Sequence, residues 1–336
     1  MRVLLCVLLL APLTRAAALP APAGPVSATD FRGKQITLPG PASRIVCLIE
    51  SALSGLYMLG AEQRVIGVSS NVYQESVFPY YAAMDPRIRE KSLPTPGNWD
   101  FVNLESLVSL QPDLVILWSH QEESIQALEE KGIPVFGVFI SQFADVHREI
   151  AALGQLTGTG PRAEELLAYS RQTLDQLQHR VAGLPAGPRV RLYYMWAQGE
   201  LETSGKNSTV DELIGLAGAT NVAGTVPHEH FIANMENVLM WDPEVIVMWY
   251  NTKRDPADVL ALSRWQSVSA VRERRVHEFP DVFSCDLWTL KYLFAAQLVA
   301  TWCYPVPSVA ADLATARAAV FRQLYGEKAP IAVGAP

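Results

Sequence analysis

Residues 102–118 read VNLESLVSLQPDLVILW, and residues 233–249 read ANMENVLMWDPEVIVMW. The two stretches align without a gap at an offset of 131 residues. They share an asparagine, a glutamate, a proline and a tryptophan, at Asn103/Asn234, Glu105/Glu236, Pro112/Pro243 and Trp118/Trp249. Self-similarity at this distance indicates that one structural unit occurs twice in the chain.

Each copy predicts a helix followed by a buried strand. Asparagine is a good helix N-cap, and the glutamate two residues later lies where the helix dipole favours negative charge. Apolar residues recur at helical spacing up to the proline, which ends the helix. The uninterrupted apolar runs that follow, LVILW and VIVMW, are typical of strands covered on both faces of a parallel sheet.

The remaining segments extend this pattern through both halves of the chain. Strand-like runs separated by helical or turn-rich segments read RIVCLI, RVIGV and PVFGVF in the first half, and RVRLYYMW and RVHEF in the second. Such alternation predicts βαβ units. We therefore expect an α/β protein with two doubly wound lobes, each containing a parallel sheet.

A long helix is predicted between the two halves, at about residues 161–182. Pro161 suits a first helical turn, leucines recur at helical spacing, and Gly183 ends the pattern. About 20 residues span roughly 30 Å, enough to cross from one lobe to the other. We expect lobes at 28–145 and 185–328, joined by a segment at 146–184 that contains this helix and limits hinge motion.

Composition and the first residues restrict the class of function. The 336-residue chain is 49% hydrophobic and 18% charged, with a net charge of −7 and no run of Lys and Arg. This balance excludes a disordered chain and argues against a nucleic-acid partner. Residues 1–18 have the basic start, apolar stretch and small residues of a secretory signal peptide. We expect a soluble, exported protein that acts as a monomer.

Three cysteines, Cys47, Cys285 and Cys303, follow the predicted signal peptide. Cys47 lies in an apolar strand pattern, which predicts a buried thiol. Cys285 and Cys303 bracket a helical stretch and form the one plausible disulfide pair, although the sequence leaves open whether they are bonded. The chain has no C-x-x-C, H-E-x-x-H, G-x-S-x-G or Gly-rich nucleotide-binding motif, which argues against an enzyme.

The chain resembles the helix-linked (class III) periplasmic substrate-binding proteins of ABC importers, which carry ferric siderophores, vitamin B12, haem and some metals or oxyanions. The resemblance covers about residues 28–325 and includes, in order, RIVCLIESALSGLYMLGAEQRVIGV, GNWDFVNLESLVSLQPDLVILW, the central helix, NSTVDELIGLAGATNVAG and ANMENVLMWDPEVIVMW. It implies a ligand cleft between the lobes, no catalysis, no cofactor, and delivery of the ligand to a permease dimer with its ATPase.

The resemblance also implies an acidic residue on each lobe that docks on permease arginines. In the second half this position falls on Glu212, beside Asp211. In the first half the corresponding position is Ser54, a departure from the family pattern, and Glu50 one turn earlier is the substitute. Ordinary solvated helix acids are the alternative for Asp211 and Glu212, and a different docking surface on the first lobe is the alternative to Glu50.

Ligands of open α/β sheets bind beyond the carboxyl ends of the strands, which nominates the segments that follow each predicted strand. The candidate ligand-binding residues there are Tyr73, Asn98, Trp99, Trp118, His120, Trp196, His228, His230, Trp249, Tyr250 and Trp288. Walls so rich in tryptophan suit a large metal complex better than a bare ion. Each of these tryptophans has packing in the core as its alternative role.

The candidate metal-contacting residues are His120, His228, Glu229 and His230, because imidazole and carboxylate can cap an open site of an iron chelate. We expect metal to be carried only as part of the ligand. The favoured function is capture of a ferric siderophore or related metal complex. A corrinoid, haem, or a molybdate or tungstate oxyanion are alternatives, and an exported metal-dependent hydrolase is the alternative from another class.

Overall fold

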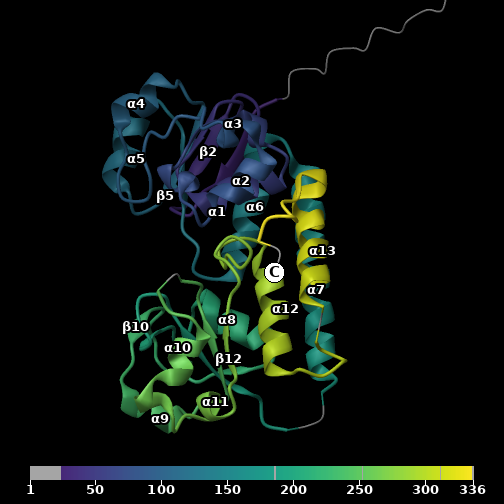
Figure 1. The fold of residues 1–336 in the computed structure, drawn as a ribbon. Coiled ribbons are helices and arrows are strands. Elements are labelled where there is room, and N and C mark those ends of the chain that lie inside the picture. Colours follow the sequence, from purple (N-terminus) through teal and green to yellow (C-terminus); the bar gives the residue numbers. More distant parts are fainter. Residues whose placement is uncertain (1–23, 185–186, 252, 311, 335–336) are drawn as a thin grey trace, which may run out of the picture.

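The computed structural model describes residues 24–184, 187–251, 253–310 and 312–334 of the chain. The predicted signal peptide lies outside these ranges. The described residues form two α/β lobes, each built on a four-stranded parallel sheet, as the sequence predicts (Figure 1). Within these ranges no helix combines the length and the apolar character needed to cross a membrane.

The first lobe contains every strand predicted for it. Its sheet has the order β4-β3-β5-β6, and all neighbouring strands are parallel. A hairpin that the sequence patterns did not predict, β1–β2, precedes it. The elements are β1 Val26–Thr29, β2 Gln35–Leu38, β3 Ile45–Cys47, α1 Glu50–Met58, η1 Glu62–Arg64, β4 Val65–Val68, η2 Ser70–Tyr73, α2 Phe78–Met84, α3 Pro86–Arg89, α4 Leu104–Ser109, β5 Leu114–Trp118, α5 Glu122–Glu129, β6 Val135–Val138 and α6 Phe143–Thr157.

The second lobe repeats this arrangement, with the parallel order β12-β11-β7-β9. A short antiparallel pair, β8–β10, lies apart from this sheet. The elements are β7 Arg191–Met195, β8 Glu202–Thr203, α8 Thr209–Leu216, β9 Thr220–Asn221, β10 Phe231–Ile232, α9 Met235–Trp241, β11 Val245–Met248, α10 Pro256–Ala261, η3 Ser263–Trp265, α11 Ser269–Arg272, β12 Val276–Glu278, α12 Tyr292–Cys303, α13 Leu313–Tyr325 and η4 Gly326–Lys328.

The duplicated sequence forms the same local structure in both lobes. Asn103 caps α4 by accepting a hydrogen bond from Ser106 N, and Asn234 caps α9 by accepting one from Asn237 N. The apolar runs become β5 and β11, which are central strands and fully buried over most of their length. The prediction of a helix followed by a buried strand is confirmed for both copies.

One long helix joins the lobes, and α12 and α13 near the end of the chain add packing contacts between them. Helix α7, Gly160–Ala182, lies where the long helix was predicted and runs alongside α12 from one lobe toward the other (Figure 1). Helix α13 contacts α1 of the first lobe, where Tyr325 and Ser54 share a hydrogen bond of 2.6 Å. The last helix therefore returns to the first lobe, although the sequence suggested a second lobe that extends to 328. The proposed lobe boundaries remain predictions.

Aromatic stacking also holds the lobes together. The segment between β12 and α12, which we call loop 279–291, reaches the first lobe through Phe283, whose ring stacks on Tyr80 at 4.4 Å between centroids. Tyr292 at the start of α12 stacks on Phe143 at the start of α6 at 3.9 Å. The largest cluster of buried side chains runs through both lobes and the connecting helices. A continuous core of this kind favours small relative movements of the lobes.

The disulfide considered for Cys285 and Cys303 is absent, because all three described cysteines are buried free thiols. Cys285 lies in loop 279–291, before α12, whereas Cys303 is the last residue of that helix. The helix is about 18 Å long at 1.5 Å per residue, so Cys285 could reach Cys303 only if the loop folded back along the whole of α12. Cys47 is buried in β3, as predicted.

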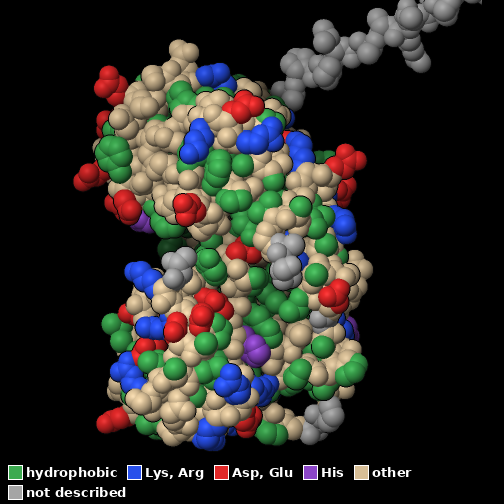
Figure 2. All heavy atoms as spheres, viewed as in Figure 1, with side chains coloured by type: hydrophobic (Ala, Val, Ile, Leu, Met, Phe, Trp, Pro, Cys, Tyr) green, Lys and Arg blue, Asp and Glu red, His purple; other side chains and the backbone are tan. Residues whose placement is uncertain are grey.

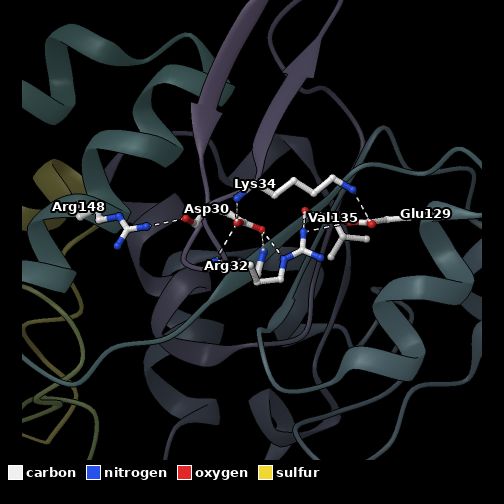
Figure 3. Close-up of polar contacts among 7 residues, drawn as sticks. Asp30, Arg32, Lys34, Glu129, Val135 and Arg148 are labelled. Atoms are coloured by element: carbon white, nitrogen blue, oxygen red, sulfur yellow. Dashed lines mark hydrogen bonds and ion pairs between the residues drawn. The ribbon is translucent and has the colours of Figure 1, made fainter.

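A network of charged residues fixes the β1–β2 hairpin to the first sheet (Figure 3). Asp30 is fully buried, and its carboxylate accepts hydrogen bonds from Arg32 Nε at 2.6 Å and from the backbone N–H groups of residues 32, 34 and 137. Arg32 also forms an ion pair with Glu129 Oε1 at 3.0 Å, and Lys34 Nζ forms one with Glu129 Oε2 at 2.5 Å. The hairpin is thereby joined to α5 and β6.

Substituting Asp30→Asn is expected to lower the free energy of unfolding by about 3 kcal/mol, because a buried ion pair loses its negative partner and one backbone N–H faces an amide donor. Urea unfolding followed by circular dichroism measures the change. Asp175→Asn, an exposed change on α7, serves as the control and should cost less than about 0.5 kcal/mol. Equal effects of the two substitutions would contradict the role given to Asp30.

Candidate functional site

The strands of both sheets end near the junction of the lobes. In the first lobe, β3 leads into Glu50 at the start of α1, and β5 ends at Trp118. In the second lobe, β7 and β11 lead directly into Trp196 and Trp249, and loop 279–291 follows β12. Figure 2 shows the surface hollowed between the lobes on the side opposite α7. This hollow is the candidate ligand cleft, since ligands bind beyond the carboxyl ends of such strands.

Three of the predicted tryptophans lie together beyond the strands of the second lobe, and we call Trp196, Trp249 and Trp288 the aromatic wall of the candidate cleft. The ring centroids of Trp196 and Trp249 are 5.4 Å apart, and those of Trp249 and Trp288 are 5.8 Å apart. All three side chains are only partly buried, so part of each indole remains available for contact. The sequence placed these residues in three separate segments, and the structure brings them together.

His230 extends the aromatic wall. Its ring stacks on Trp196 at 5.8 Å, and its Nε2 lies 2.6 Å from Glu202 Oε2. The short β8–β10 pair holds this arrangement, because Glu202 belongs to β8 and His230 immediately precedes β10. The contact with a carboxylate favours a proton on Nε2, which leaves Nδ1 as the lone-pair nitrogen, as is common for histidines that bind metals.

The other candidate metal-contacting residues do not converge with His230. His228 and Glu229 are exposed in the loop before β10, and His120 stacks at 6.2 Å on Trp118 in the first lobe. In the described part of the chain, no group of three or more His, Cys, Asp or Glu side chains is arranged to hold a metal ion. The geometry therefore offers single contacts to a metal complex and no dedicated ion site.

The first lobe presents its own aromatic residues on a rim loop, residues 96–103. Trp99 is 48% exposed, and its indole N–H donates a hydrogen bond to Glu50 Oε2. Gln121 Nε2 donates to Trp99 O at 3.0 Å, and its Oε1 accepts from Trp118 N at 3.2 Å. These bonds hold Trp99 and Trp118 in fixed relation. Phe101 and Phe139 are also exposed, and the sequence analysis did not single them out.

Three further candidates have different surroundings. Asn98 uses its side chain inside the rim loop, since Oδ1 accepts from Asp100 N and Phe101 N. The Tyr73 hydroxyl donates to Leu93 O at 3.2 Å, which ties η2 to the neighbouring loop. Tyr250 is half-buried beside Trp249. Asn98 and Tyr73 therefore have structural partners, and their contact with a ligand remains a prediction.

Three acidic side chains lie where the lobes meet, and we call Glu50, Glu149 and Asp286 the floor carboxylates. Burial raises the pKa of Glu149 to about 8 and also raises the pKa of Glu50, and the charge of Asp286 adds to both shifts. Asp286 Oδ2 lies 3.5 Å from Nζ of the buried Lys291. Glu50 and Glu149 belong to the first lobe and Asp286 to loop 279–291, so this group forms where the lobes meet.

The two acids that the resemblance assigns to docking in the second lobe have partners within the protein. Glu212 on α8 is half-buried, and its Oε2 accepts a hydrogen bond of 2.6 Å from Phe143 N at the start of α6. Burial raises the pKa of this carboxyl. Asp211 Oδ1 accepts from Asn221 Nδ2 at 2.9 Å. Their docking role, like that of Glu50, remains a prediction.

A separate cavity of about 470 Å³ opens on the first lobe; its lining consists of Arg32, Ser119, Glu122, Ile125, Gln126, Glu129 and Glu130. Two charged residues of this lining, Arg32 and Glu129, are already paired, because Arg32 bonds to both Asp30 and Glu129. The cavity also lacks the aromatic surface of the cleft. We therefore place the ligand site between the lobes.

Comparisons with known proteins agree with this architecture. The sequence model of the periplasmic binding protein family matches residues 45–282. The molybdate-binding protein MolA of Haemophilus influenzae is 24% identical over 274 residues, which cover 75% of this chain and 77% of MolA. A cobalamin-binding protein of Halobacterium salinarum is 27% identical over 248 residues, covering 73% of this chain and 64% of that protein.

Solved structures share the same fold. The structure of MolA bound to molybdate superposes with a TM-score of 0.76 at 22% identity and covers 89% of this chain and 97% of MolA. The structure of Helicobacter pylori CeuE with Ni(II) bound gives a TM-score of 0.74 at 19% identity, with 91% and 98% covered. These relatives carry chemically different ligands, so the shared fold does not identify the ligand of this chain.

Proposed function

The chain belongs to the periplasmic binding protein family, and we propose that it captures a ferric siderophore or a related metal complex in the cleft for delivery to a permease. Its class is that of the substrate-binding proteins of ABC importers, which bind their ligands without converting them. The hydrolase alternative is accordingly wrong. Location in the periplasm, a monomeric state and a permease dimer with its ATPase as partner belong to the proposal.

The aromatic wall is the observation that carries this proposal. Three indoles within about 6 Å of one another, with a histidine stacked on the first, offer a broad apolar surface. Such a surface binds a bulky complex by burying the complex's organic faces. A small oxyanion has no organic surface to bury. His230 adds one nitrogen that can contact the metal or its chelating groups.

The charges around the cleft argue against molybdate or tungstate as the cargo. A free oxyanion needs several convergent N–H donors or cations. Arg254 pairs with Glu200 at 3.2 Å, and Arg264 pairs with the same carboxylate. Lys206 and Lys253 are exposed, where solvated charge contributes little. Because the chain is similar to MolA, molybdate is included among the ligands tested below.

A corrinoid is the second candidate. Relatives named as cobalamin-binding and vitamin B12-binding proteins match 73% and 64% of this chain. A corrinoid also has a large organic surface around a metal, and the aromatic wall suits it for the same reason. Haem shares this property and stays an alternative.

Tryptophan fluorescence during titration with a panel of compounds tests the proposal. The panel contains the ferric hydroxamate ferrioxamine B, ferric enterobactin, cyanocobalamin, haemin and sodium molybdate. We expect strong quenching by at least one metal complex with a Kd of about 1 µM or below, and none by molybdate. Saturable binding of molybdate without binding of any metal complex would reject the proposed cargo class.

A further inference from the structure

The floor carboxylates are a group of negative charges, at the junction of the lobes, that nearby positive charges do not balance. We propose that Glu50, Glu149 and Asp286 form a subsite for a positively charged group of the cargo, such as a protonated amine. The inference rests on the proposed capture of a metal complex and adds a requirement on its charge.

The floor carboxylates carry more negative charge than the neighbouring lysine can balance. Asp286 has Lys291 as its counter-charge at 3.5 Å, and the ammonium also lies 3.7 Å from the centroid of the Phe283 ring. The hydrogen bonds to Glu50 come from neutral groups, which include the indole of Trp99 and the side chain of Ser69. Three carboxylates thus share one ammonium, and burying an uncompensated carboxylate is costly unless it binds a proton or a cation.

Glu149 supplies the observation that points to a ligand. The residue is 1% exposed, and its Oε1 has no hydrogen-bond partner among the described residues. Its carboxylate lies against α1 at Gly55, where an added Cβ would be 4.0 Å from Oε2. Ser51, one turn earlier on the same helix face, also has a buried hydroxyl without a partner. Buried polar atoms are nearly always bonded, so these atoms call for a partner that the described residues do not provide.

The aromatic residues near the floor carboxylates also favour a positively charged group. A cation over the face of a tryptophan is attracted by the ring, by about 0.5–2 kcal/mol depending on desolvation. The second lobe contributes the aromatic wall, and the first contributes Trp99, whose indole is anchored on Glu50 itself. Tryptophans beside carboxylates, as Trp99 is beside Glu50 and Trp288 beside Asp286, form an arrangement suited to ammonium groups.

The proposed occupant is an organic cation and not a bare metal ion. Direct coordination needs ligands that converge on one point at about 2.0–2.6 Å. The described residues contain no such group of three acidic, cysteine or histidine side chains. An ammonium can instead donate several separate hydrogen bonds to acceptors that lie further apart.

Ferrioxamine B and its N-acetyl derivative are a matched pair of probes, because both hold iron in the same hydroxamates and only the first carries a protonated amine. With wild-type protein at neutral pH, we expect ferrioxamine B to bind at least about ten-fold more tightly. Glu50→Gln and Glu149→Gln should each reduce this ratio to less than about three-fold, with little change for the acetylated complex.

Calorimetry in two buffers of different ionisation enthalpy gives an independent readout. Since burial holds the pKa of Glu149 near 8, arrival of a cation should displace its proton, and ferrioxamine B should release protons where the acetylated complex does not. Glu149→Gln should abolish this difference. A residue with only a structural role would not alter proton release.

The control substitution is Glu236→Gln, which removes the same charge from an exposed position on α9, away from the cleft. It should preserve both the affinity ratio and the proton release. Equal affinity of the two complexes for wild-type protein would overturn the inference and leave the proposed function intact. Failure of both complexes to bind would overturn the ferric hydroxamate cargo and the inference together.

Discussion

Replacing Trp196 and Trp249 together by alanine is expected to lower the affinity for ferrioxamine B by about a thousand-fold. Each substitution removes the large apolar contact of an indole. Truncating an anchoring aromatic residue in a binding site typically costs about 2–4 kcal/mol of binding free energy. The rings are 5.4 Å apart, so both would face the same part of the cargo. Isothermal titration calorimetry measures the change without depending on tryptophan fluorescence.

The matched control for this double variant is Trp241→Ala. Trp241 ends α9, and its ring centroid lies 6.4 Å from that of Tyr193, in a buried apolar cluster that contains none of the aromatic-wall residues. Its removal should change affinity by less than about two-fold, even if it lowers stability. Circular dichroism establishes that each variant is folded. A double variant that binds as well as Trp241→Ala would show that the wall does not hold the cargo.

Substituting Glu149→Gln is expected to stabilise the protein above neutral pH by about 3–5 kcal/mol. Burial raises the pKa of Glu149 to about 8, from a usual value of 4.5, so the folded protein retains a proton that the unfolded chain has lost. The contribution of this group to the free energy of unfolding is fully present below pH 4.5 and is lost as the pH rises toward 8. The neutral amide avoids that loss.

Urea unfolding at about pH 5 and about pH 9 tests this expectation. The groups that act on Glu149 or share its surroundings are Cys47 of β3, Glu50 of α1, and Asp286 and Lys291 of loop 279–291. The variant and the wild type should be similar in stability at the lower pH and diverge at the higher one. Parallel pH profiles would contradict the buried, protonated state of Glu149.

The duplicated helix and strand could be predicted because their signals are local. The asparagine cap, the helical spacing and the ending proline occur within a few residues, and β5 and β11 follow directly. The β1–β2 hairpin has strands of four residues and depends on Asp30 bonding to Gly137, which is 107 residues away. Short strands stabilised by distant partners leave little pattern in the sequence.

The candidate site was predictable in its position and less so in its polar contacts. The rule for strand ends located the aromatic wall, since Trp196 and Trp249 directly follow β7 and β11. Glu149 resembles an ordinary surface acid beside Arg148, and its burial depends on packing of α6 against α1. Asp286 and Glu50 meet only because loop 279–291 returns to the first lobe, which no local pattern indicates.

Competitive native mass spectrometry tests the central claim most directly. The protein is incubated with an equimolar mixture of ferrioxamine B, cyanocobalamin, haemin and sodium molybdate, in parallel with the variant that lacks Trp196 and Trp249. The account predicts a one-to-one adduct with an iron or cobalt complex for the wild type, and its loss in the variant. An adduct with molybdate alone, or a metal-complex adduct that survives removal of both tryptophans, would contradict it.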